Sequence, residues 1–202
     1  MAGFRLGVLG GTFDPPHLGH LLVAQEAVES LGLSRLLFVV ASQPPHKEGR
    51  KLSPADVRSE MARAAIGDHP RLGVSEVEFH RDGPSYTVDT LRYFRSEHPD
   101  AEIFFILGAD QLAEFHEWKD PEEILELATL VAVARDGHTP GGVAAPALPS
   151  GRPVEFEALE VTRVDISATG IRERVASGRT IRYRVPEAVN DIIERYRLYR
   201  GT

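Results

Sequence analysis

Short apolar runs alternate along the chain with segments in which apolar residues recur at helical spacing. The run RLLFVVA at residues 35–41 is typical of a strand covered on both faces of a parallel sheet. Residues 18–31 carry apolar side chains at the spacing of an amphipathic helix. The pattern predicts strands at Phe4–Leu9, Arg35–Ala41, Leu72–Phe79, Glu102–Leu107, Thr129–Ala134 and Val154–Leu159. It predicts helices at Leu18–Leu31, from a Ser53 cap to about Ile66, and at Thr87–Ser96, Asp110–Phe115, Pro121–Leu127, Ser167–Ala176 and Pro186–Tyr199.

This order of elements indicates an α/β fold, in which helices cover a doubly wound, mostly parallel sheet through right-handed crossovers. Ligands of such sheets bind beyond the carboxyl ends of the strands. The segment after Leu9, the segment Gly108–Asp110 and Arg135 each follow a predicted strand, so we expect them to share one site. Residues 136–153 (DGHTPGGVAAPALPSGRP) are too long for an ordinary connection and predict a mobile surface loop.

Composition narrows the class of protein. The chain has 202 residues, 42% of them hydrophobic, which suits one well-cored domain. It contains no cysteine, which excludes disulfides, thiolate metal sites and a cysteine nucleophile. No secretory pattern opens the chain and no apolar run approaches the ~18 residues of a membrane span, so we expect a cytoplasmic protein without a membrane partner.

The net charge of −7 argues against a broad basic face for nucleic acid. The charge is uneven, because nine arginines stand against six acids from Glu160 onward, a local balance of +3. A solvated helical face is the commoner reason for such a balance. A site for a small polyanion, or a docking face for RNA or protein, is the alternative.

The segment LGGTFDPPHLGHLL at residues 9–22 joins the first predicted strand to the first predicted helix. Gly10 and Gly11 allow a sharp turn and a close approach to a ligand, and the start of the helix favours phosphate. His17 and His20 are three residues apart and fall on one helix face. Each feature alone is more often structural, as a plain turn or a polar cap. Together they predict a site for phosphoryl oxygens, while a metal site lacks a third ligand at suitable spacing.

Two motifs carry a resemblance to a known superfamily. Gly11-Thr12-Phe13-Asp14, His17, Gly19 and His20 resemble the signature G-T-F-D-x-x-H-x-G-H of the HxGH nucleotidyltransferases. Residues 166–172 (ISATGIR) resemble the I-S-x-T-x-I-R element of these enzymes, with Ser167 as a helix cap and Arg172 as a cation for phosphate. The resemblance implies a single nucleotidyltransferase domain over 1–202, with a Rossmann-like core at 1–160 and a small C-terminal helical part at 161–202.

Three further stretches narrow the resemblance. Pro44–Lys47 (PPHK), Pro84–Leu91 (PSYTVDTL) and Ile106–Asp110 (ILGAD) with the later Trp118 are similar to elements of bacterial nicotinate mononucleotide adenylyltransferases. Members of that family transfer AMP from ATP to nicotinate mononucleotide, giving deamido-NAD and pyrophosphate. Nicotinamide mononucleotide and phosphopantetheine are the alternative acceptors, and a regulatory module that binds ATP without turnover is the alternative of another class. Ala41 stands where relatives often carry asparagine.

The resemblance also implies the site residues. The ATP-binding set is Gly10, Gly11, Thr12, Phe13, His17, His20, Gly108, Asp110, Arg135, Ser167 and Arg172, of which His17, His20 and Arg172 are expected to be catalytic. The set for nicotinate mononucleotide is His46, Lys47, Tyr86, Thr87, Trp118 and Lys119. Mg²⁺ is expected to be carried by ATP and not by a protein site.

Ordinary structural roles stay open for several of these residues. Trp118 could be a core residue, Thr87 a helix cap, and His46 and Lys47 a solvated pair. The last predicted helix, with Ile192 and Tyr199 on its apolar side, could pack on its own sheet or on a partner, so a homo-oligomer is left open.

Overall fold

A computed structural model describes residues 3–44, 52–133 and 147–200 of the chain. They form a six-stranded sheet in the order β3-β2-β1-β4-β5-β6, in which every neighbouring pair is parallel. The strands are β1 (Arg5–Gly11), β2 (Arg35–Val40), β3 (Leu72–Ser75), β4 (Glu102–Gly108), β5 (Thr129–Val133) and β6 (Glu157–Leu159). This order confirms the predicted Rossmann-like α/β fold.

The helices alternate with these strands along the chain. The α-helices are α1 (Leu18–Ser30), α2 (Ala55–Ile66), α3 (Thr87–Glu97), α4 (Ala109–Ala113), α5 (Pro121–Leu127), α6 (Ala168–Ala176) and α7 (Glu187–Arg195), and the 3-10 helices are η2 (Val77–His80) and η3 (Phe115–Glu117). None of the helices in the described part of the chain is long and apolar enough to cross a membrane.

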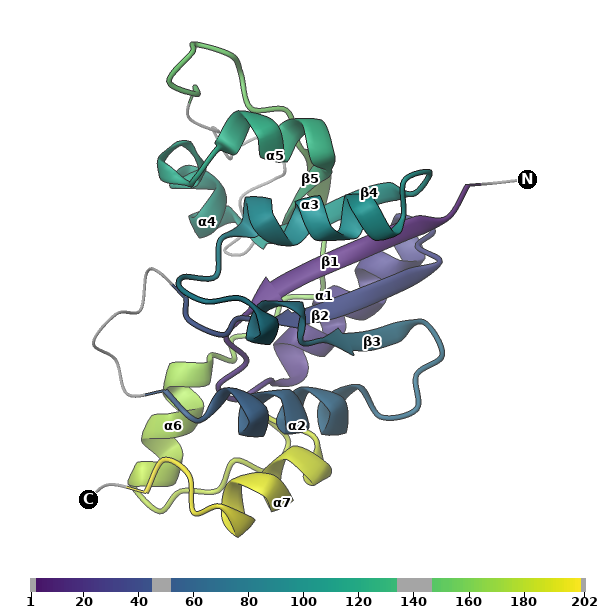
Figure 1. The fold of residues 1–202 in the computed structure, drawn as a ribbon. Helices are drawn as coiled ribbons and strands as arrows, with labels where there is room; N and C mark the ends of the chain where they lie inside the picture. Colours follow the sequence, from purple (N-terminus) through teal and green to yellow (C-terminus); the bar gives the residue numbers. More distant parts are fainter. Residues whose placement is uncertain (1–2, 45–51, 134–146, 201–202) are drawn as a thin grey trace.

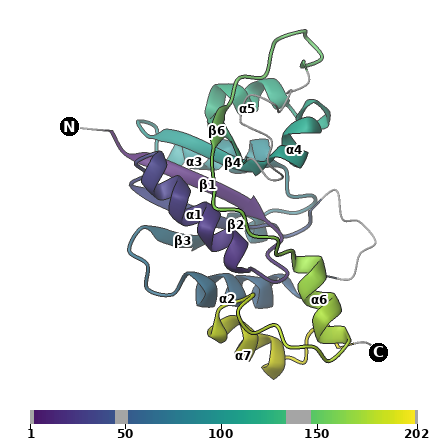
Figure 2. The same cartoon turned by 180° about the vertical axis from the view of Figure 1, so that it is seen from behind.

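After a charged first residue, the central strands β1, β2 and β4 hold only apolar residues and glycine, because both of their faces are covered. Val8 of β1 is in register with Leu37 of β2 and Phe105 of β4. Successive side chains of β4 point to opposite faces, so Phe105 packs under α3 and α5 while Phe104 packs under α1. The two views in Figures 1 and 2 show α3 on one face of the sheet and α1 on the other.

A third cluster lies outside the sheet, between α2 and the C-terminal helices. Met61 of α2, Ile171 of α6 and Ile192 of α7 are all buried in it. The last helix therefore packs on α2 of its own chain (Figure 1). Figures 1 and 2 also place α6 beside the carboxyl ends of the central strands.

Three predicted elements were too long. The strand predicted at Leu72–Phe79 ends at Ser75 and gives way to η2, because Glu78 turns inward to a hydrogen bond with Thr90. The strand predicted from Val154 begins at Glu157, where pairing with β5 starts. The last helix ends at Arg195 and not at Tyr199, because the chain beyond it turns through residues with positive φ.

Other boundaries also differ from the prediction. Ser53 is not the cap of α2: Pro54 holds that position, and the carbonyl oxygen of Ser53 accepts a hydrogen bond from Arg58. The helix predicted at Asp110–Phe115 is divided into α4 and η3. Arg135 and most of the predicted loop 136–153 lie outside the described residues.

Candidate active site

The turn between β1 and α1 runs from Thr12 to His17 and is built around Phe13. The backbone of Phe13 has φ of 50°, in the left-handed region, and its ring is buried with 3% exposure. A Cβ on Gly11 would lie 2.8 Å from that ring, so the turn requires glycine there. The Phe13 ring belongs to the core, so its backbone is the part that could contact a ligand.

The two histidines of the opening motif stack on each other at the start of α1. His17 is buried and precedes the first residue of the helix, and the ring centroids of His17 and His20 are 3.7 Å apart. The backbone N–H of His17 donates to Nδ1 of His20 at 3.2 Å. An imidazole that accepts at Nδ1 carries its hydrogen at Nε2 when neutral, so His20 is a donor at Nε2. His20 is thus a polar cap of the helix start, as one of the two interpretations of the sequence expects. The same hydrogen bond leaves Nε2 as the nitrogen with which the neutral ring can donate.

The second motif lies directly against the first. Ser167 is the N-cap of α6, and its Oγ accepts a hydrogen bond from Gly170 N at 3.1 Å, as predicted. Arg172 Nη1 donates to the carbonyl oxygen of Asp14 at 2.8 Å, and Nη2 donates to Thr169 Oγ1 at 3.0 Å. The structure therefore joins elements that are 158 residues apart in the sequence.

The end of β4 offers a third group at the same edge of the sheet. Asp110 lies in the first turn of the short α4, with its side chain exposed. Its Oδ1 folds back over Gly108, well inside contact distance of the point where a Cβ would stand. Gly108 N donates to Gln111 Oε1 at 3.1 Å, which fixes the start of the helix. A side chain at position 108 would therefore displace the Asp110 carboxylate from this position.

A cavity of about 170 Å³ lies beside the opening turn, between the ends of β1 and β2, the start of α3 and the segment that holds Trp118. The predicted acceptor residues that line it are Tyr86, Thr87, Trp118 and Lys119, together with Gly10 and Gly11 of the opening motif. Trp118 is half-buried, and its ring packs on Phe115 at a centroid distance of 5.5 Å while the residue still borders the cavity. Thr87 makes no side-chain cap for α3, whose N-cap is Tyr86. The structure therefore brings these four of the six predicted acceptor residues to one cavity beside the opening turn.

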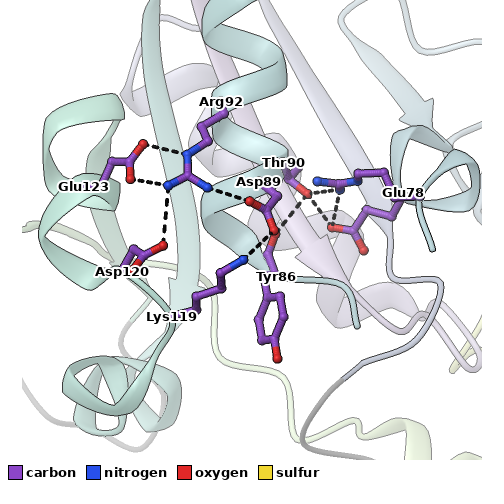
Figure 3. A network of polar contacts seen from close by, with 9 residues as sticks. Glu78, Tyr86, Asp89, Thr90, Arg92, Lys119, Asp120 and Glu123 are labelled. Carbon is purple, nitrogen blue, oxygen red and sulfur yellow. Dashed lines mark hydrogen bonds and ion pairs between the residues drawn. The ribbon is translucent and has the colours of Figure 1, made fainter. Parts of the chain in front are cut away.

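A network of charged side chains adjoins the part of the cavity lined by Tyr86 and Lys119 (Figure 3). Lys119 Nζ donates to Asp89 Oδ2 at 3.1 Å and lies 4.6 Å from the ring centroid of Tyr86. Arg92 donates to Asp89 and, through two nitrogens, to Glu123. Burial raises the pKa of Asp89, but hydrogen bonds and charges from Lys119 and Arg92 outweigh it, so the pKa lies below its ordinary value. The ammonium of Lys119 is engaged here, which leaves its backbone N–H as the group expected at a ligand.

Three residues in and behind the cavity wall, Glu78, Arg81 and Thr90, were not predicted as site residues from the sequence, and Glu78 is the one that lines the cavity. Thr90 Oγ1 donates to Glu78 Oε1 at 2.7 Å and accepts from Arg81 Nη2 at 2.5 Å (Figure 3). Glu78 borders the cavity and is buried, with 7% exposure. Its Oε2 and Arg81 Nη1 have no hydrogen-bond partner among the described residues. A buried acceptor without a partner carries a desolvation cost, so Glu78 is the residue of this group that could accept from a ligand in the cavity.

Arg58 is a further residue that the sequence prediction missed. Its side chain is 1% exposed, and among the described residues its guanidinium donates to backbone carbonyl groups. The acceptors are the oxygens of Thr12 at 2.9 Å, Ala41 at 2.6 Å, Ser42 at 3.2 Å and Ser53 at 2.9 Å. Burial lowers the pKa of Arg58, and the charge of nearby Asp14 opposes that shift. Arg58 therefore ties the opening turn to both sides of the segment 43–52.

The remaining predicted residues lie outside the described part of the chain. These are His46, Lys47 and Arg135. Among the described residues there is also no group of three or more His, Cys, Asp or Glu side chains that could hold a metal ion. At this edge of the sheet the described residues thus offer donors for anions beside a cavity, and they hold no metal-binding cluster.

Comparisons with known proteins agree with this arrangement. The family model described as cytidylyltransferase-like matches residues 8–174. A Thermus thermophilus protein named "Probable nicotinate-nucleotide adenylyltransferase" is 49% identical over 97% of this chain and 100% of its own length. A protein of the same name from Thermomicrobium roseum is 44% identical over 97% of this chain and 92% of its own length.

A solved structure shares the fold at low sequence identity. The nicotinic acid mononucleotide adenylyltransferase of Plasmodium falciparum, complexed with NaAD, has a TM-score of 0.79 and 17% identity, and the match covers 97% of each chain. This likeness supports the sheet order described above, while the more similar bacterial relatives carry the family assignment. The chain belongs to the cytidylyltransferase-like family and, within it, to the nicotinate-nucleotide adenylyltransferases.

Proposed function

We propose that the protein transfers AMP from ATP to nicotinate mononucleotide, giving nicotinate adenine dinucleotide (deamido-NAD) and pyrophosphate. The observation that carries the proposal is the bond between Arg172 and the carbonyl oxygen of Asp14. It brings the donors of both nucleotidyltransferase motifs to one place, next to a cavity bordered by Trp118 and Thr87. The family to which the chain belongs carries the same activity in the names of its members.

In this reaction an oxygen of the acceptor's 5′-phosphate forms a bond to the α-phosphorus of ATP. The bond from the α-phosphorus to the bridging oxygen breaks, and pyrophosphate leaves with that electron pair. The attacking phosphate is already ionised near neutral pH, so the protein has to align charged groups and stabilise charge, and no covalent intermediate is needed.

The ATP side of the site consists of the two motifs and the end of β4. We assign Nε2 of His20 to the α-phosphoryl oxygens, with His17 beside it, because that ring nitrogen is the donor. Ser167 and Arg172 are assigned to the β- and γ-phosphates, where a planar guanidinium can donate to two oxygens. Asp110 is assigned to the ribose hydroxyls of ATP. Mg²⁺ enters as part of the substrate, bound to the triphosphate.

The acceptor side is the cavity beside Gly10 and Gly11. Nicotinate is a flat ring with a carboxylate, and the indole of Trp118 offers a surface on which such a ring stacks. The hydroxyl of Thr87 and the backbone N–H of Lys119 are assigned to the carboxylate. His46 and Lys47 stay predictions for the phosphates of both substrates, and Arg135 stays a weaker prediction for ATP.

The proposal is tested by release of pyrophosphate from ATP. Initial rates are measured with nicotinate mononucleotide, nicotinamide mononucleotide and phosphopantetheine at matched concentrations. We expect the highest kcat/KM with nicotinate mononucleotide. A higher kcat/KM with another acceptor would show that this acceptor is the preferred substrate. Binding of ATP with no release of pyrophosphate in the presence of any of the three acceptors would refute the proposed enzymatic activity. A cytoplasmic location stays a prediction from the sequence.

A further inference from the structure

The chain returns to the opening turn after its last helix. Beyond α7 the backbone turns at Arg197 and Tyr199, which have φ of 52° and 59°. The hydroxyl of Tyr199 donates to Asp14 Oδ1 at 2.6 Å, a contact between residues 185 positions apart. Non-glycine residues in the left-handed region carry a conformational cost, which the surrounding structure has to outweigh. The tail is thus held in a particular shape, with Tyr199 directed at Asp14.

Asp14 is held at three points. Its Oδ1 accepts from Tyr199, its Oδ2 accepts from Ser53 N at 3.3 Å, and its carbonyl oxygen accepts from Arg172 at 2.8 Å. Asp14 itself is buried, with 3% exposure. It lies three residues before His17 in the turn of the opening motif. The position of this one residue therefore relates the turn to Arg172 and to the tail.

The hydrogen bond from the Tyr199 hydroxyl to Asp14 joins a neutral donor to a carboxylate oxygen. A neutral donor to a carboxylate makes a shorter and stronger hydrogen bond than a pair of neutral groups. Burial and the charge of Asp14 raise the pKa of Tyr199, while Ser53 and the charge of Arg172 lower it without reversing the shift. Arg58 is a further charged group near the hydroxyl. The hydroxyl therefore keeps its proton and remains a donor at neutral pH.

We propose that Tyr199 is a positioning residue for AMP transfer, which fixes Asp14 and thereby the turn that carries His17 and His20 relative to Arg172. The inference rests on the proposed function for its reaction and on the three contacts of Asp14 for its geometry. Tyr199 acts on the ATP side only, since it does not border the acceptor cavity that Trp118 lines.

The test is Tyr199→Phe in the full-length chain, which removes the hydroxyl and keeps the ring in its apolar surroundings. We expect kcat to fall about 10-fold, which corresponds to about 1.4 kcal/mol. The dissociation constant for MgATP, measured by titration calorimetry without acceptor, is expected to rise roughly fivefold, or about 1 kcal/mol. The KM for nicotinate mononucleotide should stay within about twofold of the wild-type value.

Tyr196→Phe is the matched control. Tyr196 lies in the same segment but is 47% exposed, and a hydrogen bond with Glu60 raises the pKa of its hydroxyl. Its loss removes a tyrosine–carboxylate contact away from the turn, so kcat and the dissociation constant for MgATP should match the wild type. General destabilisation would lower the melting temperature and the amount of active enzyme, and would leave the affinity of the folded enzyme for MgATP unchanged.

Wild-type affinity for MgATP and wild-type kcat in Tyr199→Phe would overturn the inference, as would an equal loss in Tyr196→Phe. If Tyr199→Phe does not fold, Asp14→Asn is compared in its place: unchanged MgATP affinity would then be the refuting result. Failure of the proposed function gives a different pattern, in which the wild type releases no pyrophosphate with any acceptor. The calorimetric comparison of the variants still decides the role of Tyr199 in that case.

Discussion

Replacing Arg58 by methionine tests whether the buried guanidinium holds the opening turn. Methionine is unbranched and apolar, so it fills much of the same space without leaving a large cavity. The change removes the donor to the carbonyl oxygens of Thr12, Ala41, Ser42 and Ser53. It also removes a positive charge that interacts with the buried carboxylate of Asp14.

The expected loss follows from these contacts. Leaving a buried acceptor without its partner costs about 1–3 kcal/mol, and Arg58→Met affects four carbonyl groups as well as the charge near Asp14. The separate hydrogen bonds are not summed, since the freed carbonyl groups are partly hydrated after the change. We therefore expect Arg58→Met to lower the free energy of unfolding by about 3 kcal/mol, the upper end of that range. For a chain of this length that lowers the melting temperature by roughly 10 °C.

The assay is urea unfolding at 25 °C followed by far-UV circular dichroism. Arg63→Met is the matched control on the same helix, because Arg63 pairs with Glu76 at 2.9 Å with half of its side chain exposed. Such a surface pair contributes less than about 1 kcal/mol. An Arg58→Met loss as small as that of Arg63→Met would show that the four carbonyl contacts do not hold the turn, and the reasoning would be wrong.

Three further predictions concern the proposed reaction. His20→Ala should lower kcat by ~10²–10³, the cost of one donor to the transition state, and an unchanged steady-state kcat would remove His20 from the mechanism. Trp118→Ala should raise the acceptor KM ~10-fold or more with little change in the KM for ATP, because a stacking surface is lost; equal effects on both substrates would make Trp118 only structural. Gly108→Ala should raise the KM for ATP several-fold, roughly 1 kcal/mol, because its Cβ would displace the Asp110 carboxylate. If the KM for ATP in Gly108→Ala equals that of the wild type, the Asp110 carboxylate does not contribute to ATP binding.

The central sheet was predictable because its signal is local. Strands such as β2 and β4 are covered on both faces, so their sequences are apolar runs with little ambiguity. The edge of the sheet was less predictable. Alternating residues from Leu72 to Phe79 are typical of a strand, yet η2 forms after Ser75, since Glu78 gains a buried hydrogen bond with Thr90 by turning inward. That partner lies on α3, and no local pattern points to it.

In the candidate site, too, the residues with a local sequence signal were predictable and those that depend on distant partners were not. The motifs around His17, His20 and Arg172 were recognised from their residues, and the structure brings them together. The supporting residues were missed because their partners are distant in sequence. Arg58 lies on the inward face of α2 beside Met61 and Ala62, so an arginine among apolar core positions was the one available signal.

The turn of the opening motif is held from three directions, and this explains why a helical part follows the sheet. Arg58 of α2 binds Thr12, Arg172 of α6 binds Asp14, and the carbonyl oxygen of Arg184 accepts from Leu18 N at 3.0 Å. The hydrophobic cluster between α2, α6 and α7 therefore holds in place the elements that carry Arg58 and Arg172, whose side chains bind the turn.

The direction of these contacts also suits an anion. In a trans peptide the C=O and N–H groups point in opposite directions. When Arg58 holds the carbonyl oxygen of Thr12, the N–H of Phe13 in the same peptide unit points away from the buried guanidinium. A cation inside the protein thus orients a backbone donor toward the opposite side of the turn, where phosphoryl oxygens can accept it. Loss of Arg58 should for this reason weaken ATP binding as well as stability.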